Sequence, residues 1–160
     1  MANPGRSVSN TLLVRNRQRT VRIDTRLWRR ILEALLVELL RTGSFELEIN
    51  ITGAREMTRL NETFLRHRGS TDVLTFDYAE GPRKPALCGE IFVCADEARI
   101  QAARFRTSWQ SELVRYVVHG VLHLNGYDDQ RSASRGKMKR EENRLLKELA
   151  RRFDFGKLQK

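Results

Sequence analysis

The most constraining feature of this 160-residue chain is one amphipathic segment, residues 107–124, which predicts a long helix. Apolar side chains recur in it at helical spacing and cover half of its circumference. Thr107-Ser-Trp-Gln110 is similar to a capping box at its start. Asn125-Gly126 predicts its end, because glycine readily adopts the left-handed turn that folds the chain back. This segment is therefore the best-defined predicted element of the chain.

Two histidines, His119 and His123, project from the other half of this predicted helix. Because they are four residues apart, their ring nitrogens can face one point, as two ligands of a tetrahedral metal do. Asp129 follows three residues after Gly126 and can supply a third, anionic ligand. Two solvated histidines on a polar helix face are the alternative. Three ligands at this spacing, two imidazoles and one carboxylate, favour a metal site of His119, His123 and Asp129.

The same spacing occurs in metzincin proteases, whose motif is H-E-x-x-H-x-x-G-x-x-H. This chain has Gly120 where those enzymes place the glutamate that acts as general base. The missing base argues against peptide hydrolysis, and the small residue leaves space near the metal for a bulkier substrate such as a phosphodiester. An iron oxygenase with two histidines and one carboxylate fits the ligand types, but no cofactor-site signal accompanies them.

Short strands and helices follow one another in the rest of the chain without strict alternation. We expect one α+β domain over residues 1–160, with a flexible leader at 1–10, a small mixed sheet of about four strands and about five helices. Asp24 is the expected N-cap of the first helix, Gly43 its end, and Phe64 an inward-facing residue of the second. The predicted strands are 11–14, 20–23, 45–51, 73–76 and 87–94, and the predicted helices are 24–41, 55–66, 96–105, 107–124 and 134–152.

Charge and cysteine content narrow the functional classes. The formal net charge is +10, and 24 of the 30 cations are arginines, whose forked guanidinium binds phosphate. This balance favours a nucleic acid as partner, although a preference for arginine codons would also produce it. The two cysteines are too few for a disulfide framework. With no signal peptide and no apolar stretch long enough for a bilayer, a cytoplasmic protein without membrane contact is expected.

Several blocks of the chain resemble one known family. The segment from His119 to Asp129, H-G-V-L-H-L-N-G-Y-D-D, closely resembles the signature H-G-x-L-H-L-x-G-Y-D-H of the YbeY family. The family blocks L-N…T-D-V-L-S-F, L-G-[DE]-I and M-x3-E are matched in the same order. The matching residues are 60–61 with 71–76, 87–91, and Met138 with Glu142.

The resemblance implies a bacterial zinc-dependent endoribonuclease with a metzincin-like metal-binding helix. Such an enzyme cleaves single-stranded RNA during maturation of the 16S rRNA 3′ end and acts in ribosome quality control. Its partners would be ribosomal RNA and the small ribosomal subunit, without a nucleotide cofactor. One Zn²⁺ per chain would be bound with an open fourth position. The alternative is a non-catalytic assembly factor that docks on RNA and holds a structural metal. The oligomeric state is not predicted.

This chain departs from the family pattern at two positions. The third metal ligand is histidine in most of the family and Asp129 here, unless Asp128 ligates instead. A carboxylate also ligates zinc, and it makes Mn²⁺ or Fe²⁺ acceptable. The family's L-N-x-x-[FY]-R places a functional arginine where this chain has Leu65. Arg66 and Arg68 follow directly and are candidates for RNA contacts.

No general base is identified. Asp72 and Asp128 are the catalytic candidates, because either carboxylate could orient a water molecule or a metal ligand. The alternative for both is that they cap turns, which aspartate does frequently.

Overall fold

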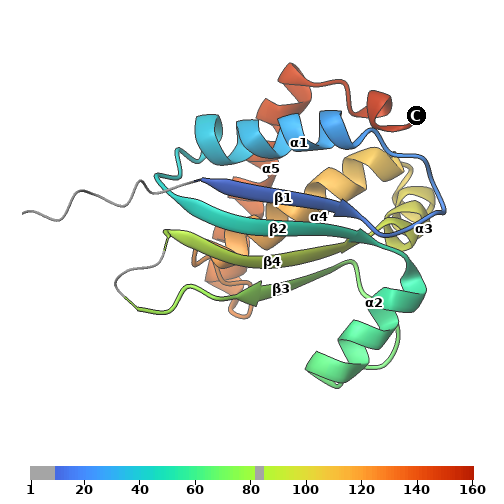
Figure 1. Cartoon of the computed structure of the whole chain (residues 1–160), viewed down its shortest axis with the longest axis horizontal. Helices are drawn as coiled ribbons and strands as arrows, with labels where there is room; N and C mark the ends of the chain where they lie inside the picture. Colours follow the sequence, from blue (N-terminus) through green and yellow to red (C-terminus); the bar gives the residue numbers. More distant parts are fainter. Residues whose placement is uncertain (1–9, 82–84) are drawn as a thin grey trace, which may run out of the picture.

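The computed structural model describes residues 10–81 and 85–160, so most of the expected leader lies outside the described residues. A four-stranded mixed sheet forms one layer, in the order β1-β2-β4-β3 (Figure 1). The strands are β1 (Thr11–Asn16), β2 (Phe45–Thr52), β3 (Val73–Asp77) and β4 (Leu87–Cys94). β1, β2 and β4 are parallel, and β3 pairs with β4 antiparallel. This confirms the predicted α+β domain with a small mixed sheet.

Five α-helices accompany the sheet in the described part of the chain, as expected. π-helical segments extend the first two of them, and a short 3₁₀ segment follows the last. In chain order the elements are α1 (Thr25–Glu33) with η1 (Ala34–Leu39), α2 (Ala54–Leu60) with η2 (Asn61–Leu65), α3 (Ala95–Phe105), α4 (Trp109–Leu124), α5 (Ser132–Arg152) and η3 (Phe155–Leu158). In this part of the chain, no helix is both long and apolar enough to cross a membrane.

The main core lies between one face of the sheet and helices α1, α4 and α5. α4 lies at its centre, packed against β3 and β4 and contacting α3 and α5. Ile49 and Ile91 pair across β2 and β4, and Thr75 continues the same row on β3. Alternate side chains of β4 point the other way, where Phe92 and Cys94 form a second small core with Met57 of α2.

The predicted strand at 20–23 is wrong. Among these residues only Ile23 forms a bridge, to Gln159. The buried side chain of Gln18 accounts for the difference, because its Oε1 accepts from the backbone N–H groups of Thr20 (2.8 Å) and Val21 (3.0 Å). These bonds fix a loop, and local side-chain bonds of this kind compete with strand pairing.

The first predicted helix begins as expected and ends differently. The Asp24 carboxylate caps it, accepting from the backbone N–H of Arg26 at 3.0 Å and of Leu27 at 3.1 Å. Its end is made by Arg41, which takes a left-handed φ of 49°, and not by Gly43. The preceding turn is π-helical, with Leu40 N–H bonded to the Leu35 carbonyl.

A π-helical segment also ends the second predicted helix, which therefore differs from the prediction. Phe64 is 60% exposed instead of inward-facing. The π-helical segment η2 begins at Asn61, and one extra residue per turn rotates the following side chains away from the core. The buried Asn61 amide anchors the turn by donating to the Gly69 carbonyl at 3.0 Å. Arg66, with φ of 53°, ends the segment.

The N-cap of α4 lies one residue later than the capping box predicts. Ser108 Oγ accepts from Ser111 N–H at 3.1 Å, and Thr107 instead donates to the Glu112 carboxylate at 2.8 Å. The helix ends at Asn125-Gly126 as expected, with Gly126 at φ of 92°.

Gly120 lets α4 approach the sheet closely. A Cβ at this position would lie 2.9 Å from Ile91 Cγ2 and 3.1 Å from Thr75 Cγ2. The absent side chain would therefore point at β4 and β3, so the glycine serves packing and not, as the sequence suggested, free space for substrate at the metal.

We expect Gly120→Ala to lower the free energy of unfolding by about 1–3 kcal/mol, as overpacking of a core does. Chemical denaturation measures this. The control is Gly136→Ala on α5, where a Cβ meets only the Arg140 guanidinium at 3.5 Å. That variant should be neutral or slightly more stable, because alanine is the better helix former. Equal stabilities of the two variants would contradict the packing argument.

Candidate metal centre

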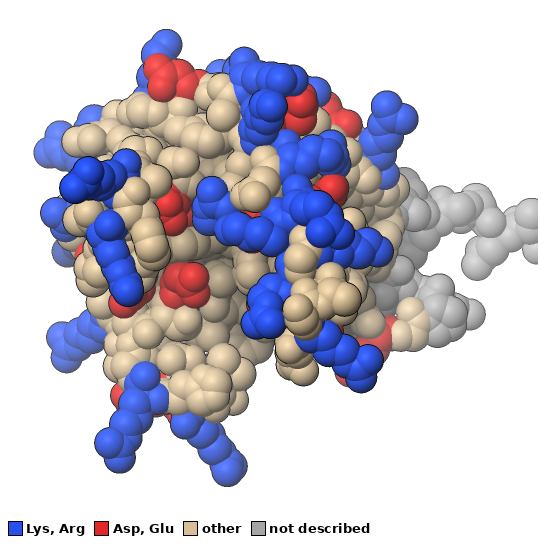
Figure 2. Space-filling model, turned by 180° about the vertical axis from the view of Figure 1, so that it is seen from behind, with Lys and Arg blue, Asp and Glu red and all other residues tan. Residues whose placement is uncertain are grey.

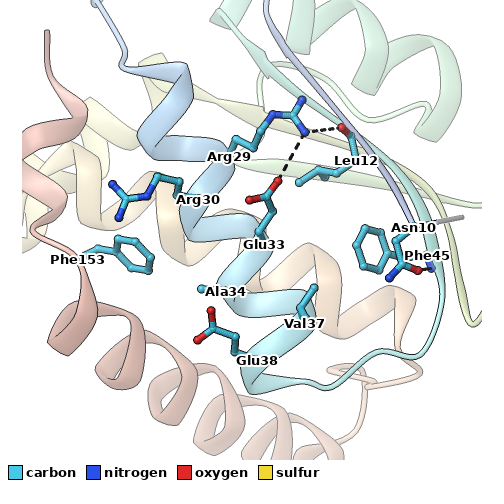
Figure 3. A pocket seen from close by; sticks show the side chains of 10 residues that line it. All are labelled: Asn10, Leu12, Arg29, Arg30, Glu33, Ala34, Val37, Glu38, Phe45 and Phe153. Atoms are coloured by element: carbon cyan, nitrogen blue, oxygen red, sulfur yellow. Dashed lines mark hydrogen bonds and ion pairs between the residues drawn. The ribbon is translucent and has the colours of Figure 1, made fainter.

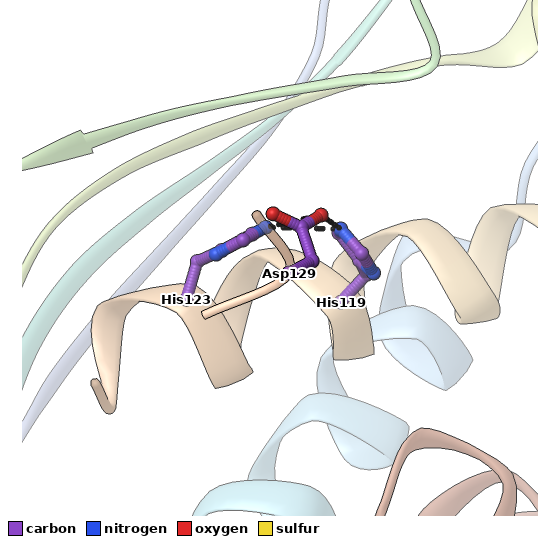
Figure 4. Close-up of side chains that lie close together, drawn as sticks. All are labelled: His119, His123 and Asp129. Carbon is purple, nitrogen blue, oxygen red and sulfur yellow. Dashed lines mark hydrogen bonds and ion pairs between the residues drawn. The ribbon is translucent and has the colours of Figure 1, made fainter. Parts of the chain in front are cut away.

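Three polar side chains converge at the C-terminal end of α4 (Figure 4). His119 Nε2 and His123 Nε2 are 3.0 Å apart. Asp129, from the loop after the helix, places Oδ2 3.5 Å from the first nitrogen and 3.4 Å from the second. Within residues 10–81 and 85–160, this is the only group of histidine, cysteine and acidic side chains arranged to hold a metal ion.

The hydrogen bonds of both imidazoles leave the facing nitrogens without protons. His123 Nδ1 lies 3.1 Å from the Tyr127 carbonyl oxygen, which can only accept, so Nδ1 carries the proton. His119 Nδ1 lies 2.8 Å from Glu142 Oε2 and donates to that carboxylate. In the neutral rings, two nitrogen lone pairs and a carboxylate oxygen therefore face one another, an arrangement that a bound metal cation would satisfy.

The spacing of the three atoms fits a tetrahedral metal. Ligand bonds of 2.0–2.1 Å separate neighbouring ligand atoms of a tetrahedron by about 3.3–3.4 Å. The observed separations of 3.0, 3.4 and 3.5 Å bracket this value. The residues present fit a metal with two histidine ligands and one carboxylate ligand.

Glu142 of α5 fixes His119 from behind. Its side chain is buried and also accepts from Arg115 Nη1 at 2.7 Å and from Lys139 Nζ at 3.1 Å. Burial by itself raises the pKa of Glu142, but the hydrogen bonds from His119 and Arg115 and the nearby Lys139 charge outweigh it and lower the pKa to about 2. Glu142 is therefore ionised at neutral pH.

The same contact acts on His119. Burial by itself lowers the pKa of His119, but the hydrogen bond to Glu142 and the negative charges around it raise the pKa above its usual value. A carboxylate behind a metal-binding histidine fixes the ring orientation and makes the facing nitrogen a better ligand.

A cleft of 300 Å³, here named the metal cleft, opens beside His119 and Asp129, between α4 and α5. Asp72 reaches its wall from the start of β3, while its Oδ1 accepts from the backbone N–H of Val73 at 2.9 Å. The structure therefore places this catalytic candidate in the same cleft as His119 and Asp129. The other lining residues are Arg115, Tyr116, Arg135, Met138, Lys139 and Glu142.

The remaining candidates lie elsewhere. Asp128 Oδ1 accepts from Gln130 N–H at 3.0 Å and so caps the turn, while its neighbour Asp129 faces the histidines. Arg66 and Arg68 do not line the cleft. Leu65 is 48% exposed on η2, so the position of the family arginine carries an outward-facing apolar side chain.

Sequence reasoning found no role for Glu142, although a signal was present. The apolar seam of α5 includes Met138, Leu145 and Leu149, and Glu142 lies on the same side of the helix. An acidic residue within an apolar seam predicts a buried partner, which here is the histidine ring. No sequence pattern marked the basic residues of the cleft, because basic residues are common throughout the chain. These residues are Arg115, Arg135 and Lys139.

A separate groove of 560 Å³ runs between α1, η1 and the edge strand β1 (Figure 3). Arg29 Nη1 donates to the Leu12 carbonyl at 2.8 Å and lies 4.0 Å from the Glu33 carboxylate. Arg30 lies over the Phe153 ring, 5.6 Å from its centroid. Both cations are thus already in contact with neighbouring groups, and Arg29 covers part of the exposed edge of β1. We assign no reaction to this groove.

We expect Glu142→Gln to weaken metal binding by about 10- to 100-fold, since the variant loses the negative charge behind His119. Competition with a metal-sensitive dye measures the affinity. Glu141→Gln is the matched control, because within residues 10–81 and 85–160 the Glu141 carboxylate pairs only with the exposed Arg144 on the same helix. Identical affinities of the two variants would show that Glu142 does not support the ligand.

Comparisons with known proteins identify the family of this chain. The family model described as endoribonuclease YbeY matches residues 13–150. The endoribonuclease YbeY of Chlorobium phaeovibrioides is 43% identical over 61% of this chain and 64% of its own length, so the chain aligns with less than two thirds of that relative. The Salinibacter ruber and Chlorobium luteolum proteins of that name are 39% and 35% identical, over 66% and 77% of this chain and 71% and 93% of their own lengths.

The fold also has a solved counterpart. A Thermotoga maritima protein studied in solution superposes with a TM-score of 0.63 at 25% identity, covering 87% of this chain and 89% of the other. The similarity therefore extends over nearly the whole of both chains.

Proposed function

Because the chain belongs to the endoribonuclease YbeY family, we propose that it is a metal-dependent endoribonuclease that cleaves single-stranded RNA. The observation that carries the proposal is the convergence of His119 Nε2, His123 Nε2 and Asp129 Oδ2 beside an open cleft. Three protein ligands leave one tetrahedral position for water or substrate, as in catalytic zinc sites.

We propose Zn²⁺ as the metal, one per chain, with Mn²⁺ or Fe²⁺ also accepted because one ligand is a carboxylate. When bound, such an ion polarises a phosphoryl oxygen or acidifies a water molecule. Asp129 lowers the formal charge of the site from +2 to +1, which attracts a phosphodiester less strongly than three neutral ligands would.

The protein side chains around the metal would orient the reactants. Glu142 holds the His119 ring through its 2.8 Å hydrogen bond. Asp72 lies on the cleft wall and is the remaining candidate for orienting a water molecule or the RNA 2′-hydroxyl. The site lacks the metzincin glutamate, which disfavours peptide hydrolysis.

The biological setting is also part of this proposal. We propose that the substrate is ribosomal RNA, that cleavage contributes to 16S rRNA 3′ end maturation and ribosome quality control, and that the protein works with the small ribosomal subunit in the cytoplasm. Family membership and the formal net charge of +10 support this.

The second candidate is an assembly factor that docks on RNA and holds a structural metal. The exposed Leu65 at the family arginine position favours it, because a functional side chain is missing there.

One assay separates the two. Metal-loaded protein is incubated with a single-stranded RNA and with a duplex of the same sequence. The proposed function predicts internal cleavage of the single strand, stopped by a chelator. Tight RNA binding without cleavage, at full metal occupancy, would favour the assembly factor.

A further inference from the structure

Three basic side chains line the metal cleft. Arg115 lies on α4, and Arg135 and Lys139 lie on α5. Arg115 and Lys139 are already bonded to Glu142, at 2.7 and 3.1 Å. Arg135 is exposed, and its side chain makes no ion pair or hydrogen bond within the described part of the chain. One guanidinium beside the metal site is therefore free to bind an anion.

Arg135 lies on the face of α5 that lines the metal cleft. Arg135, Lys139 and Glu142 lie at positions i, i+4 and i+7 of α5, which share one face of a helix. All three line the cleft, and Glu142 is itself 2.8 Å from His119. Arg135 thus lies one turn before Lys139 on α5, the helix whose Glu142 holds His119. On the face in Figure 2, Lys and Arg side chains form a band beside a hollow.

The charge of the cleft fits an anionic ligand once the metal is bound. Among the described residues, its lining carries three basic and three acidic side chains, which balance, so a bound divalent ion leaves an excess of two positive charges. The acidic side chains are Asp72, Asp129 and Glu142, and the basic ones are Arg115, Arg135 and Lys139.

We propose that Arg135, with Lys139 beside it, binds a phosphate of the RNA strand in the metal cleft. This rests on the proposed function for the nature of the ligand. A guanidinium suits the role, because its fork donates two parallel hydrogen bonds to one phosphate. Arg66 and Arg68, next to Leu65 in sequence, are less suited, since neither lines the cleft.

The test compares Arg135→Gln with Arg140→Gln. Both residues are exposed on α5 and both changes remove one positive charge, but only Arg135 lines the cleft. The probe is a labelled single-stranded RNA with 2′-O-methyl groups, checked by gel to remain intact. Binding to metal-loaded protein is measured from low to high salt, and elemental analysis verifies equal metal content.

We expect Arg135→Gln to weaken binding at least about tenfold, the usual effect of losing hydrogen bonds to a charged group. The slope of log affinity against log salt should become shallower by about 0.7, as for one phosphate contact on a single strand. Arg140→Gln should change binding less than about twofold, and Arg135→Lys should recover part of the loss. Equal binding by Arg135→Gln and Arg140→Gln would overturn the inference.

Cleavage of unmodified RNA, measured in parallel, separates this inference from the proposed function. Binding that depends on Arg135 in a protein that cleaves nothing would refute the endoribonuclease and keep the phosphate contact. Cleavage that is equally fast in Arg135→Gln and Arg140→Gln would keep the endoribonuclease and refute the contact.

Discussion

His119→Ala is expected to reduce RNA cleavage by on the order of 10³-fold or more, the largest effect that we predict. The change removes one of three metal ligands and also leaves Glu142 without its histidine partner. Because His119 is 27% exposed, the side chain is not part of the dry core and the fold should survive its loss. Initial rates on single-stranded RNA measure the effect, with circular dichroism as the check on folding.

The matched control is His67→Ala. His67 is an exposed histidine in the loop after η2 and does not line the metal cleft. Its replacement should leave the rate within about twofold of the parent, as surface changes usually do. A folded His119→Ala variant that cleaves at the parent rate would contradict the assignment of the reaction to this site.

Removal of the metal is expected to lower the melting temperature by roughly 8–16 °C. A ligand that binds only the folded chain, at a thousand times its dissociation constant, stabilises it by about 4 kcal/mol. For a chain of this length, each kcal/mol changes the melting temperature by about 2–4 °C. Thermal denaturation with zinc and with a chelator measures the difference.

Asp129→Ala provides the control for this effect. The variant keeps both histidines but loses the anionic ligand, so zinc and chelator should give nearly the same melting temperature. An undiminished shift in Asp129→Ala would mean that the stabilising metal binds somewhere else. No shift in the parent would mean that the three side chains do not hold a metal at these concentrations.

The convergence of His119, His123 and Asp129 could be predicted from the sequence because these residues are close together in the chain. His119 and His123 share a helix whose period is set by its own apolar residues, and Gly126 fixes the turn that returns Asp129 to them. Spacing along the chain therefore determines spacing in space. The strands 45–51 and 87–94 were predictable for a similar reason, since their apolar residues recur with a strand period or form a continuous run.

The features that escaped prediction depend on contacts from other parts of the chain or on small changes of helical register. Glu142 of α5 contacts His119, which lies 23 residues earlier in the chain. Its place in the apolar seam predicts a buried partner but does not identify the histidine. In η1 and η2 each helical turn contains about one residue more than in an α-helix. In η2 this change leaves Phe64 exposed. Residues 20–23 form a loop instead of the predicted strand, because the Gln18 side chain accepts hydrogen bonds from two backbone N–H groups there.

The role of Gly120 also depends on contacts with other parts of the chain. Its place within the metal motif suggested a function toward the substrate. The structure shows that a side chain there would collide with Ile91 and Thr75, which are brought beneath α4 by the pairing of β3 with β4.

We propose that His119, His123 and Asp129 hold one metal ion and that RNA cleavage requires this ion. The most direct test is to titrate metal-free protein with zinc while measuring the initial rate of single-stranded RNA cleavage. We predict a rate near zero without zinc, a linear rise, and a plateau at one zinc per chain. Full activity without metal, or zinc binding at one per chain without any cleavage, would contradict it.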